Sequence, residues 1–352
     1  MCVEDIFLKN VLNEIVLQNG KPILVGGCVR DSFLNLEFKD YDIEVFGLSR
    51  LEDLEKILQP FGNVNLVGKH FGIVKLSTQT MEYDFSFPRI EMKIASGHKG
   101  FDISVNGSLD FKNASQRRDF TINAIGYDYK NKMYIDPFNG MEDLKNKILK
   151  HIDDKTFSED PLRVYRAVQF SARFGFELDQ RTFTLCKELV QTDDFKTLSK
   201  ERIYEEYKKL FLKSPYPSRG LFLIKELKIK EFTKIQMQYI DQFSNEKISD
   251  EEKILFIYCV LFELFIEISD DKKIKKKIMR LQNFKIPRIF VEKLKNISSF
   301  PEELIIKNEM INNMPKPLFM GKDLIKMGYN PCEKFKTILD TLYKMQLNGE
   351  IC

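Results

Sequence analysis

Tryptophan is absent from this 352-residue sequence, and histidine and cysteine are scarce. The three histidines, at positions 70, 98 and 151, form no HxxxH pair, which disfavours a metal site built from histidine. The six cysteines are scattered and form no CxxC motif. A zinc ribbon or a disulfide framework is therefore disfavoured, and reduced thiols in a cytoplasmic protein fit better.

Long apolar runs and an excess of one charge are missing too. The strongest apolar run, residues 254–268, is interrupted by Glu263 and is shorter than the roughly 20 residues of a membrane-spanning helix. The N-terminus lacks a basic segment followed by an apolar one, so we expect neither a signal peptide nor a membrane partner. With 55 basic and 52 acidic residues, the bulk charge gives no argument for nucleic-acid binding.

The residues that are present, 43% hydrophobic and 30% charged, are typical of a soluble globular protein. The length exceeds one ordinary compact core, so we expect two or more lobes. In the first 138 residues, predicted helices at 3–19, from Val29 and at 50–59 are mixed with predicted strands at 22–25, 41–46, 64–68, 72–77, 80–87, 101–105 and 122–128. Residues 88–100 show no clear period, which predicts a mobile loop.

The remaining residues follow the helical period almost throughout. The predicted helices cover residues 141–151, 160–175, 179–191, 199–213, 218–227, 251–268, 271–282, 287–297 and 333–348. This pattern predicts an α+β lobe with a small mixed sheet, followed by an all-α part. We place the predicted domains at residues 1–138, 139–213 and 214–352.

Asp40 and Asp42 occupy alternate positions of a predicted strand, so both side chains point to one face. Two converging carboxylates repel one another unless a cation lies between them, and Mg²⁺ favours a few carboxylates together with substrate phosphates. The alternative is the exposed polar face of an edge strand. Upstream, Gly26 and Gly27 follow a strand and open a helix, where backbone N–H groups can approach a phosphate and Arg30 can add a charge-assisted contact. A plain turn is the alternative there.

The combined segment, GGCVRDSFLNLEFKDYDIEVFG at residues 26–47, resembles the signature of class II nucleotidyltransferases of the polymerase-β superfamily. This family includes bacterial CCA-adding tRNA nucleotidyltransferases and their poly(A) polymerase relatives. The resemblance implies a nucleotidyltransferase head followed by a helical neck, body and tail. It also implies that Asp40 and Asp42 are catalytic and hold two Mg²⁺ ions, and that the nucleotide is bound by Gly26, Gly27 and Arg30.

Two further segments are similar to motifs of this family. Residues 116–124, QRRDFTINA, resemble a segment whose arginine contacts the triphosphate or the sugar; by position this is Arg118, supported by Arg117 and Asp119. Residues 136–140, DPFNG, resemble a turn at which the helical part begins.

The segment EDPLRVYR, at residues 159–166, places Asp160, Arg163 and Arg166 on one face of a predicted helix. Ion pairing on the helix surface is one interpretation. The other is recognition of a base, because an aspartate accepts from an exocyclic amine and an arginine donates to a ring nitrogen or carbonyl. The resemblance implies this role for Asp160 and Arg163, with Arg166 beside them at the nucleotide. Many relatives carry an arginine where this chain has Gln169, so a phosphate contact is lost or replaced here.

Basic residues are concentrated in the helical part. Residues 272–288 hold eight basic residues and no acidic one, which is either a solvated helix face or a surface for RNA phosphates. Residues 1–138 carry a net charge of −3, and the remainder carries +6. The resemblance extends to the neck at residues 200–206 and to the tail at 321–324 and 346–351.

Together these motifs predict a template-independent enzyme that uses CTP and ATP to add CMP and AMP to the 3′ end of tRNA. It would contact the acceptor stem and elbow and release pyrophosphate by a two-metal mechanism. Asp84 is a candidate for a third carboxylate, and the loop at 88–100 favours full CCA addition, because that loop is shortened in CC-adding enzymes. The alternatives are an A-adding enzyme, a poly(A) polymerase and a catalytically inactive RNA-binding relative; the oligomeric state stays open.

Overall fold

The computed structural model describes residues 5–38, 40–48, 50–67, 73–78, 82–93, 101–105, 109–245, 249–250, 317–329 and 334–347, together with 253, 254, 257, 260, 261 and 264. The chain divides into two compact units, Met1–Ile274 and Lys275–Cys352. The described part of the second unit contains helices α18 (Gly321–Lys326) and α19 (Lys334–Leu347). Among the described residues, no helix is long and apolar enough to cross a membrane.

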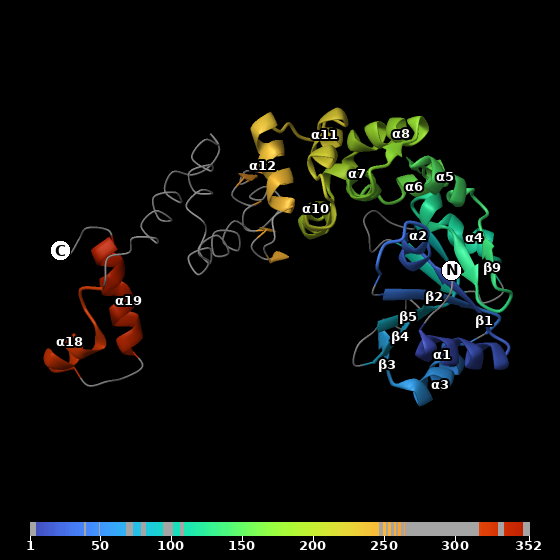
Figure 1. Cartoon of the computed structure of the whole chain (residues 1–352), viewed down its shortest axis with the longest axis horizontal. Coiled ribbons are helices and arrows are strands. Elements are labelled where there is room, and N and C mark those ends of the chain that lie inside the picture. The colour runs from blue at the N-terminus through green and yellow to red at the C-terminus, as the bar shows by residue number, and fades with distance from the viewer. Residues whose placement is uncertain are drawn as a thin grey trace. The chain divides into compact units, whose positions relative to one another are not determined.

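A seven-stranded mixed sheet organises the first unit (Figure 1). The strand order is β3-β4-β5-β2-β1-β8-β9. The strands are β1 (Lys21–Val25), β2 (Asp40–Phe46), β3 (Asn63–Val67), β4 (Ile73–Ser77), β5 (Glu82–Ser86), β8 (Gly126–Asp128) and β9 (Met133–Ile135). At its centre β2 runs parallel to β5 and antiparallel to β1. A mixed sheet followed by helices confirms the predicted α+β head and all-α continuation.

The two faces of the sheet are covered differently because β2 alternates its side chains. Tyr41, Ile43 and Val45 are buried. On their face α1 (Ile6–Leu17) and α3 (Leu51–Leu58) pack against the sheet, followed by the short turn η1 (Gln59–Phe61). The opposite face carries the acidic residues of β2. Part of it is covered by α4 (Phe111–Gln116), whose Phe111 and Ala114 pack into one apolar cluster with Ile23, Val25 and Phe46.

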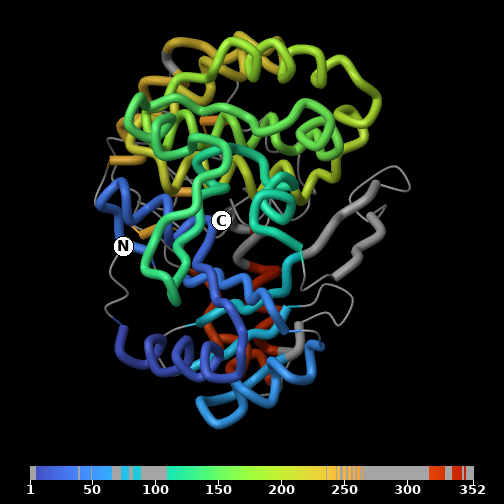
Figure 2. Tube along the Cα trace, turned by 90° about the vertical axis from the view of Figure 1, so that its right-hand side faces the viewer, coloured from blue at the N-terminus to red at the C-terminus, as the bar shows by residue number. Residues whose placement is uncertain are grey.

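Nine further helices lie in the described part of the first unit. They are α2 (Gly27–Phe33), α5 (Gly140–Asn146), α6 (Asp154–Ser158), α7 (Arg163–Phe174), α8 (Gln180–Val190), α9 (Asp193–Lys196), α10 (Lys200–Lys213), α11 (Ser218–Glu226) and α12 (Lys234–Ser244). In Figure 2 the helices from α5 to α12, drawn green to yellow, lie at one end of the unit, and α1 and α3, drawn blue, lie at the other. Both α10 and α11 pack against α7. Gly220 of α11 permits close packing on both neighbours, because a Cβ atom there would lie 2.6 Å from Leu210 Cδ1 of α10 and 3.1 Å from Val168 Cγ1 of α7.

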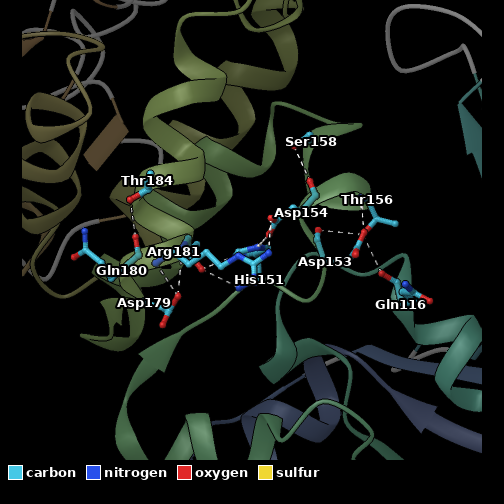
Figure 3. Close-up of polar contacts among 11 residues, drawn as sticks. Gln116, His151, Asp153, Asp154, Thr156, Ser158, Asp179, Gln180, Arg181 and Thr184 are labelled. Carbon is cyan, nitrogen blue, oxygen red and sulfur yellow. Dashed lines mark hydrogen bonds and ion pairs between the residues drawn. The ribbon is translucent and has the colours of Figure 1, made fainter.

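The connection between head and helices is held by polar contacts around His151 (Figure 3). The ring of His151 is buried, with Nδ1 2.7 Å from Thr182 Oγ1 and Nε2 2.6 Å from Asp154 Oδ1. Asp154 also accepts from Arg181 Nη2 at 2.6 Å. Nearby, Thr156 Oγ1 donates to the carbonyl of Gln116 at 3.3 Å, which joins the end of α4 to α6. Both ring nitrogens of this histidine thus serve packing between elements. Beside it the short strands β10 (Ile148–Leu149) and β11 (Glu177–Leu178) pair in parallel.

Several elements differ from the sequence-based expectation. The predicted loop at 88–100 is wrong for Arg89–Lys93, which forms β6 and pairs antiparallel with β7 (Phe101–Val105); residues 94–100 lie outside the described residues. The predicted helix at 160–175 begins only at Arg163, since Pro161 disfavours helical geometry at Asp160. The predicted strand at 122–128 is instead the turn η3 (Thr121–Asn123) followed by β8.

Other expectations are not covered by the structure. The helices predicted at 271–282 and 287–297, most of that at 251–268, and the basic run at 272–288 lie outside the described residues. The domain boundaries after residues 138 and 213 fall within the first unit and stay predictions.

Candidate active site

Four carboxylates gather at the centre of the sheet. Asp40, Asp42 and Glu44 alternate along β2 and share one face, and the parallel register places Asp84 of β5 beside Asp42. Partial desolvation raises the pKa of Asp42 above its ordinary value; Arg118 counteracts this shift, and the charges of the other three acids add to it. A divalent cation relieves this kind of repulsion.

The donor set fits Mg²⁺ held jointly by protein and substrate. Asp84 Oδ1 is buried and accepts no hydrogen bond within the described residues, although Lys75 Nζ lies 3.5 Å away. In that same part of the chain, no group of three or more His, Cys, Asp or Glu side chains is arranged so that it could hold a metal ion by itself. Oxygen ligands from nucleotide phosphates would complete the coordination that Mg²⁺ prefers.

The turn between β1 and α2 brings backbone close to these acids. Gly26 has a φ of 70°, in the left-handed region that favours glycine. A Cβ atom at Gly26 would lie 3.2 Å from Asp42 Oδ2 and 3.3 Å from Arg118 Nη1. A bare backbone therefore lies between a carboxylate and a guanidinium, which is how glycine lets main-chain atoms approach a ligand. At Gly27 a Cβ atom would make only an ordinary contact, 3.7 Å from Arg30 Nη2.

Arg30 is buried and engaged by protein groups. Its Nη2 lies 2.6 Å from Asp31 Oδ1, and its Nη1 donates to Asn123 Oδ1 at 2.6 Å. The guanidinium carbon lies 4.7 Å from the ring centre of Phe174 and 5.1 Å from that of Phe170. Arg30 thus ties α2 to η3 and to α7, in addition to lining the cavity described below.

Asp119 organises the arginines beyond this turn. It accepts from Arg166 Nη2 at 2.6 Å and from Asn123 Nδ2 at 2.8 Å. Burial raises the pKa of Asp119, but the charges of Arg166 and Arg163 and the hydrogen bond from Asn123 outweigh it and hold the pKa at about 2. The carboxylate is therefore ionised at neutral pH and fixes Arg166 at the cavity wall.

The predicted base-reading residues lie at the start of α7. Asp160 Oδ2 accepts from Arg202 Nη2 at 2.7 Å, and its Oδ1 accepts from the N–H of Leu162 at 3.2 Å. Arg163 donates through Nη1 to the carbonyl of Thr156 and through Nη2 to that of Arg117, at 2.7 and 2.6 Å. The two backbone carbonyls fix the plane of the Arg163 guanidinium.

These groups surround one cavity of about 490 Å³ in the first unit. Its lining consists of Gly26, Gly27, Arg30, Asp42, Arg117, Arg118, Asp119, Asn123, Asp160, Leu162, Arg163, Arg166 and Arg202. Six arginines face three acids in this lining, so the cavity is positively charged and suits an anion such as a triphosphate. Of the predicted site residues, Asp40 and the candidate third carboxylate Asp84 are not part of the lining; Asp40 is exposed at the start of β2.

Sequence reasoning missed three residues of this site. Asn123 and Arg202 line the cavity, and Glu44 accepts from both Arg117 Nη2 and Arg118 Nη2 at 2.8 Å. A signal existed for Glu44, since it continues the alternation of Asp40 and Asp42. Arg202 gave no such signal, because its partner Asp160 lies 42 residues earlier in the sequence, between α6 and α7. Gln169 is buried in α7 and does not belong to the cavity lining, and its Nε2 has no hydrogen-bond partner among the described residues.

Comparison with known proteins places two family models on the chain. The poly(A) polymerase head domain matches residues 23–150, and a probable RNA- and SrmB-binding site of polymerase A matches residues 175–233. The Multifunctional CCA protein of Nitrosomonas eutropha is 39% identical over 202 residues, which are 57% of this chain and 46% of that protein. A CCA-adding enzyme of Buchnera aphidicola is 38% identical over 194 residues, 54% of this chain and 44% of the relative. The chain thus spans less than half the length of these curated relatives.

Solved structures extend the likeness of fold over nearly the whole chain. The CCA-adding enzyme of Bacillus stearothermophilus, solved in complex with CTP, superposes with a TM-score of 0.68 at 22% identity, covering 99% of this chain and 94% of that one. The Thermotoga maritima CCA-adding enzyme, solved with tRNA, gives a TM-score of 0.61 at 19% identity, covering 99% and 93%. At these identities the likeness establishes the fold.

Proposed function

We propose that the chain belongs to the family of the poly(A) polymerase head domain, whose model matches residues 23–150, and that it completes the CCA 3′ end of tRNA with CTP and ATP. The observation that carries this proposal is the junction of two features. The acidic face of β2 meets an arginine-lined cavity of about 490 Å³ through a bare glycine turn. Such a junction suits transfer of a nucleotide, since the acids hold metal where the phosphates enter.

The acids of the sheet hold the metal in this proposal. Asp40 and Asp42 would hold two Mg²⁺ ions, and Asp84, which pairs with Asp42 in the strand register, would act as a third carboxylate. When bound there, Mg²⁺ would lower the pKa of the attacking 3′-hydroxyl and neutralise charge on the departing pyrophosphate. Burial raises the pKa of Asp42, and the nearby charge of Arg118 opposes part of that shift.

The arginines orient the nucleotide. Gly26 and Arg118 bind the triphosphate beside Asp42, while Asp160 and Arg163 read the base. Asp160 already accepts from Arg202 and Leu162, but an ionised carboxylate has about four acceptor positions and can take a base amine as well. Because Arg163 is held by two carbonyls, its orientation is fixed before the nucleotide arrives. Preorganised donors of this kind replace the template that other polymerases use.

The helical part holds the RNA. Residues 175–233 match a probable RNA-binding segment, and the basic run at 272–288 supplies charge for phosphates of the tRNA acceptor stem and elbow. Cys28 and Cys186 are free and buried, which suits a reducing cytoplasm.

A product-length assay tests the proposal. Purified protein and Mg²⁺ are incubated with three tRNAs, ending at the discriminator base, at C and at CC, with CTP and ATP offered separately and together. CCA addition predicts two cytidines and one adenosine on the first substrate, and one adenosine alone on the third. No extension of any substrate would contradict the proposal.

Poly(A) synthesis is the second candidate, because the matching head domain is that of a poly(A) polymerase. In the same assay a poly(A) polymerase extends all three RNAs with ATP alone into long products. An A-adding enzyme extends only the tRNA that ends in CC, and a catalytically inactive RNA-binding relative retains tRNA without extending it.

A further inference from the structure

Glu44 is a buried carboxylate in β2, at a position where packing alone would favour an apolar residue. It is 1% exposed, and its neighbours along β2, Ile43, Val45 and Phe46, are apolar and buried. Burying a carboxylate is costly, and an apolar side chain of similar size would often serve stability as well or better. One oxygen of Glu44, Oε2, is buried without a hydrogen-bond partner among the described residues. Packing therefore does not account for an acidic residue at position 44.

The other oxygen explains it. Glu44 Oε1 accepts from Arg117 Nη2 and from Arg118 Nη2, both at 2.8 Å. These arginines directly follow α4, which is anchored on the same face of the sheet by Phe111 and Ala114. Helix packing thus brings two adjacent guanidinium groups over a single buried carboxylate.

Two contacts define the orientation of the Arg118 guanidinium group. Its Nη2 is bonded to Glu44, while its Nη1 lies 3.3 Å from the position that a Cβ atom of Gly26 would occupy. One nitrogen therefore points down to the buried acid and the other toward the glycine turn and Asp42. Without Glu44, two adjacent like charges would repel each other and Arg118 would lose this fixed orientation.

We propose that Glu44 is a positioning residue, which holds Arg117 and Arg118 in the orientation that binds the triphosphate of the incoming nucleotide. This rests on the proposed function, since it concerns the same site. Glu44 is not part of the cavity lining. Its effect on the nucleotide passes through the two arginines, mainly through Arg118.

The first test is Glu44→Gln, which keeps the shape and removes the charge. We expect the KM for CTP and for ATP to rise about tenfold, the size of one lost charge-assisted hydrogen bond, with a smaller fall in kcat. Titration calorimetry with CTP and Mg²⁺, without tRNA, should show the same loss of affinity, and tRNA affinity should not change. If Glu44→Gln lowers the midpoint of thermal unfolding, Glu44→Val is measured as well, because an apolar residue suits that buried position; it must show the same rise in KM.

A double-mutant cycle separates positioning from a structural role. In an Arg118→Ala background, Glu44→Gln should add less than about a twofold further rise in KM, because the arginine that Glu44 orients is absent. A full tenfold rise in that background, or an unchanged KM for Glu44→Gln alone, overturns the inference. If the wild-type protein binds no CTP and extends no tRNA, the proposed function fails instead. Normal wild-type activity with a normal KM for Glu44→Gln removes only the positioning role.

Discussion

At Asp42 the protein concentrates charge that its fold does not require. Partial desolvation raises the pKa of this carboxyl, and Arg118 does not fully offset that shift or the charges of Asp84 and Asp40. Because the pKa in the folded state lies above the ordinary value, the stability contributed by the protonated form is lost as pH rises through it.

We therefore expect Asp42→Asn to keep or raise the midpoint of thermal unfolding at pH 7 without Mg²⁺. Nucleotide addition should fall by more than about a hundredfold, since the loss of the proposed metal ligand would remove several kcal/mol of charge stabilisation. Differential scanning calorimetry measures the midpoint of unfolding, and a tRNA-extension assay measures nucleotide addition. Joint loss of stability and activity would identify Asp42 as a structural residue.

Asp119 is the opposite case. Burial raises its pKa, but Arg166, Asn123 and Arg163 lower it from 3.8 to about 2. A depressed pKa contributes stability above the ordinary value, and that stability is lost as pH falls toward the folded-state value. The contribution at pH 7 is about 2 kcal/mol.

We expect Asp119→Asn to lower the free energy of unfolding by about 2 kcal/mol at pH 7. The difference from the wild type should shrink as pH falls from 3.8 to about 2. Urea titrations at several pH values measure this difference, with Asp42→Asn as a control of opposite sign. A difference that does not depend on pH would show that the carboxylate charge is not what Asp119 contributes.

Site residues could be predicted where local spacing sets the geometry. Asp40 and Asp42 share a face because strands alternate, and Gly26 lies at the turn because glycine suits its positive φ. The environment of Arg30 could not be predicted in this way. Asn123, Phe170 and Phe174 enclose it from distant parts of the chain, and no local pattern reports a contact of that kind.

The same distinction holds for whole elements. Helices α8 and α10 follow the 3.6-residue period and were predicted to within one or two residues. The strand β7 was predicted at its observed residues, 101–105, but β6 and β9 were not, because such short segments are defined by their partner strands rather than by their own period. The start of α7 depends on a single proline, whose effect on the preceding residue overrides the apolar pattern.

The turn that begins α5 allows a test at the level of one element. A Cβ atom on Gly140 would lie 2.2 Å from the carbonyl oxygen of Thr121, and backbone cannot yield as a flexible side chain can. We expect Gly140→Ala to lower the free energy of unfolding by about 1–3 kcal/mol, the usual cost of overpacking.

Gly27→Ala is the matched control for this substitution, because its Cβ atom would meet only a side-chain end at 3.7 Å. It should leave stability unchanged or slightly higher, since alanine restricts the unfolded chain. Chemical denaturation of both variants measures the contrast. If the two variants had equal free energies of unfolding, η3 and α5 would be able to move apart without a loss of stability.

At the scale of the whole molecule, charge is divided along the chain. The net charge of +3 combines −3 in residues 1–138 with +6 in the rest. An acidic head suits the binding of metal ions, and a basic remainder suits the binding of RNA phosphates. This division favours metal binding in residues 1–138 and RNA binding in the remainder, so substitutions of the head acids and of the basic run should have separate effects.

The densest basic run provides the test of that separation. Replacing Lys275, Lys276 and Lys277 by glutamine should weaken tRNA binding, and the slope of log affinity against log salt should become less steep by about one for each lysine that contacts a phosphate. The KM for CTP should stay unchanged, because all residues that line the described cavity lie between positions 26 and 202 of the sequence. Lys56→Gln is the control: Lys56 is exposed on α3, which packs on the sheet face opposite the acids, and its loss should leave the salt slope intact. Filter binding over a range of salt concentrations measures the slopes, and an unchanged slope for the triple variant would place the RNA surface elsewhere in the chain.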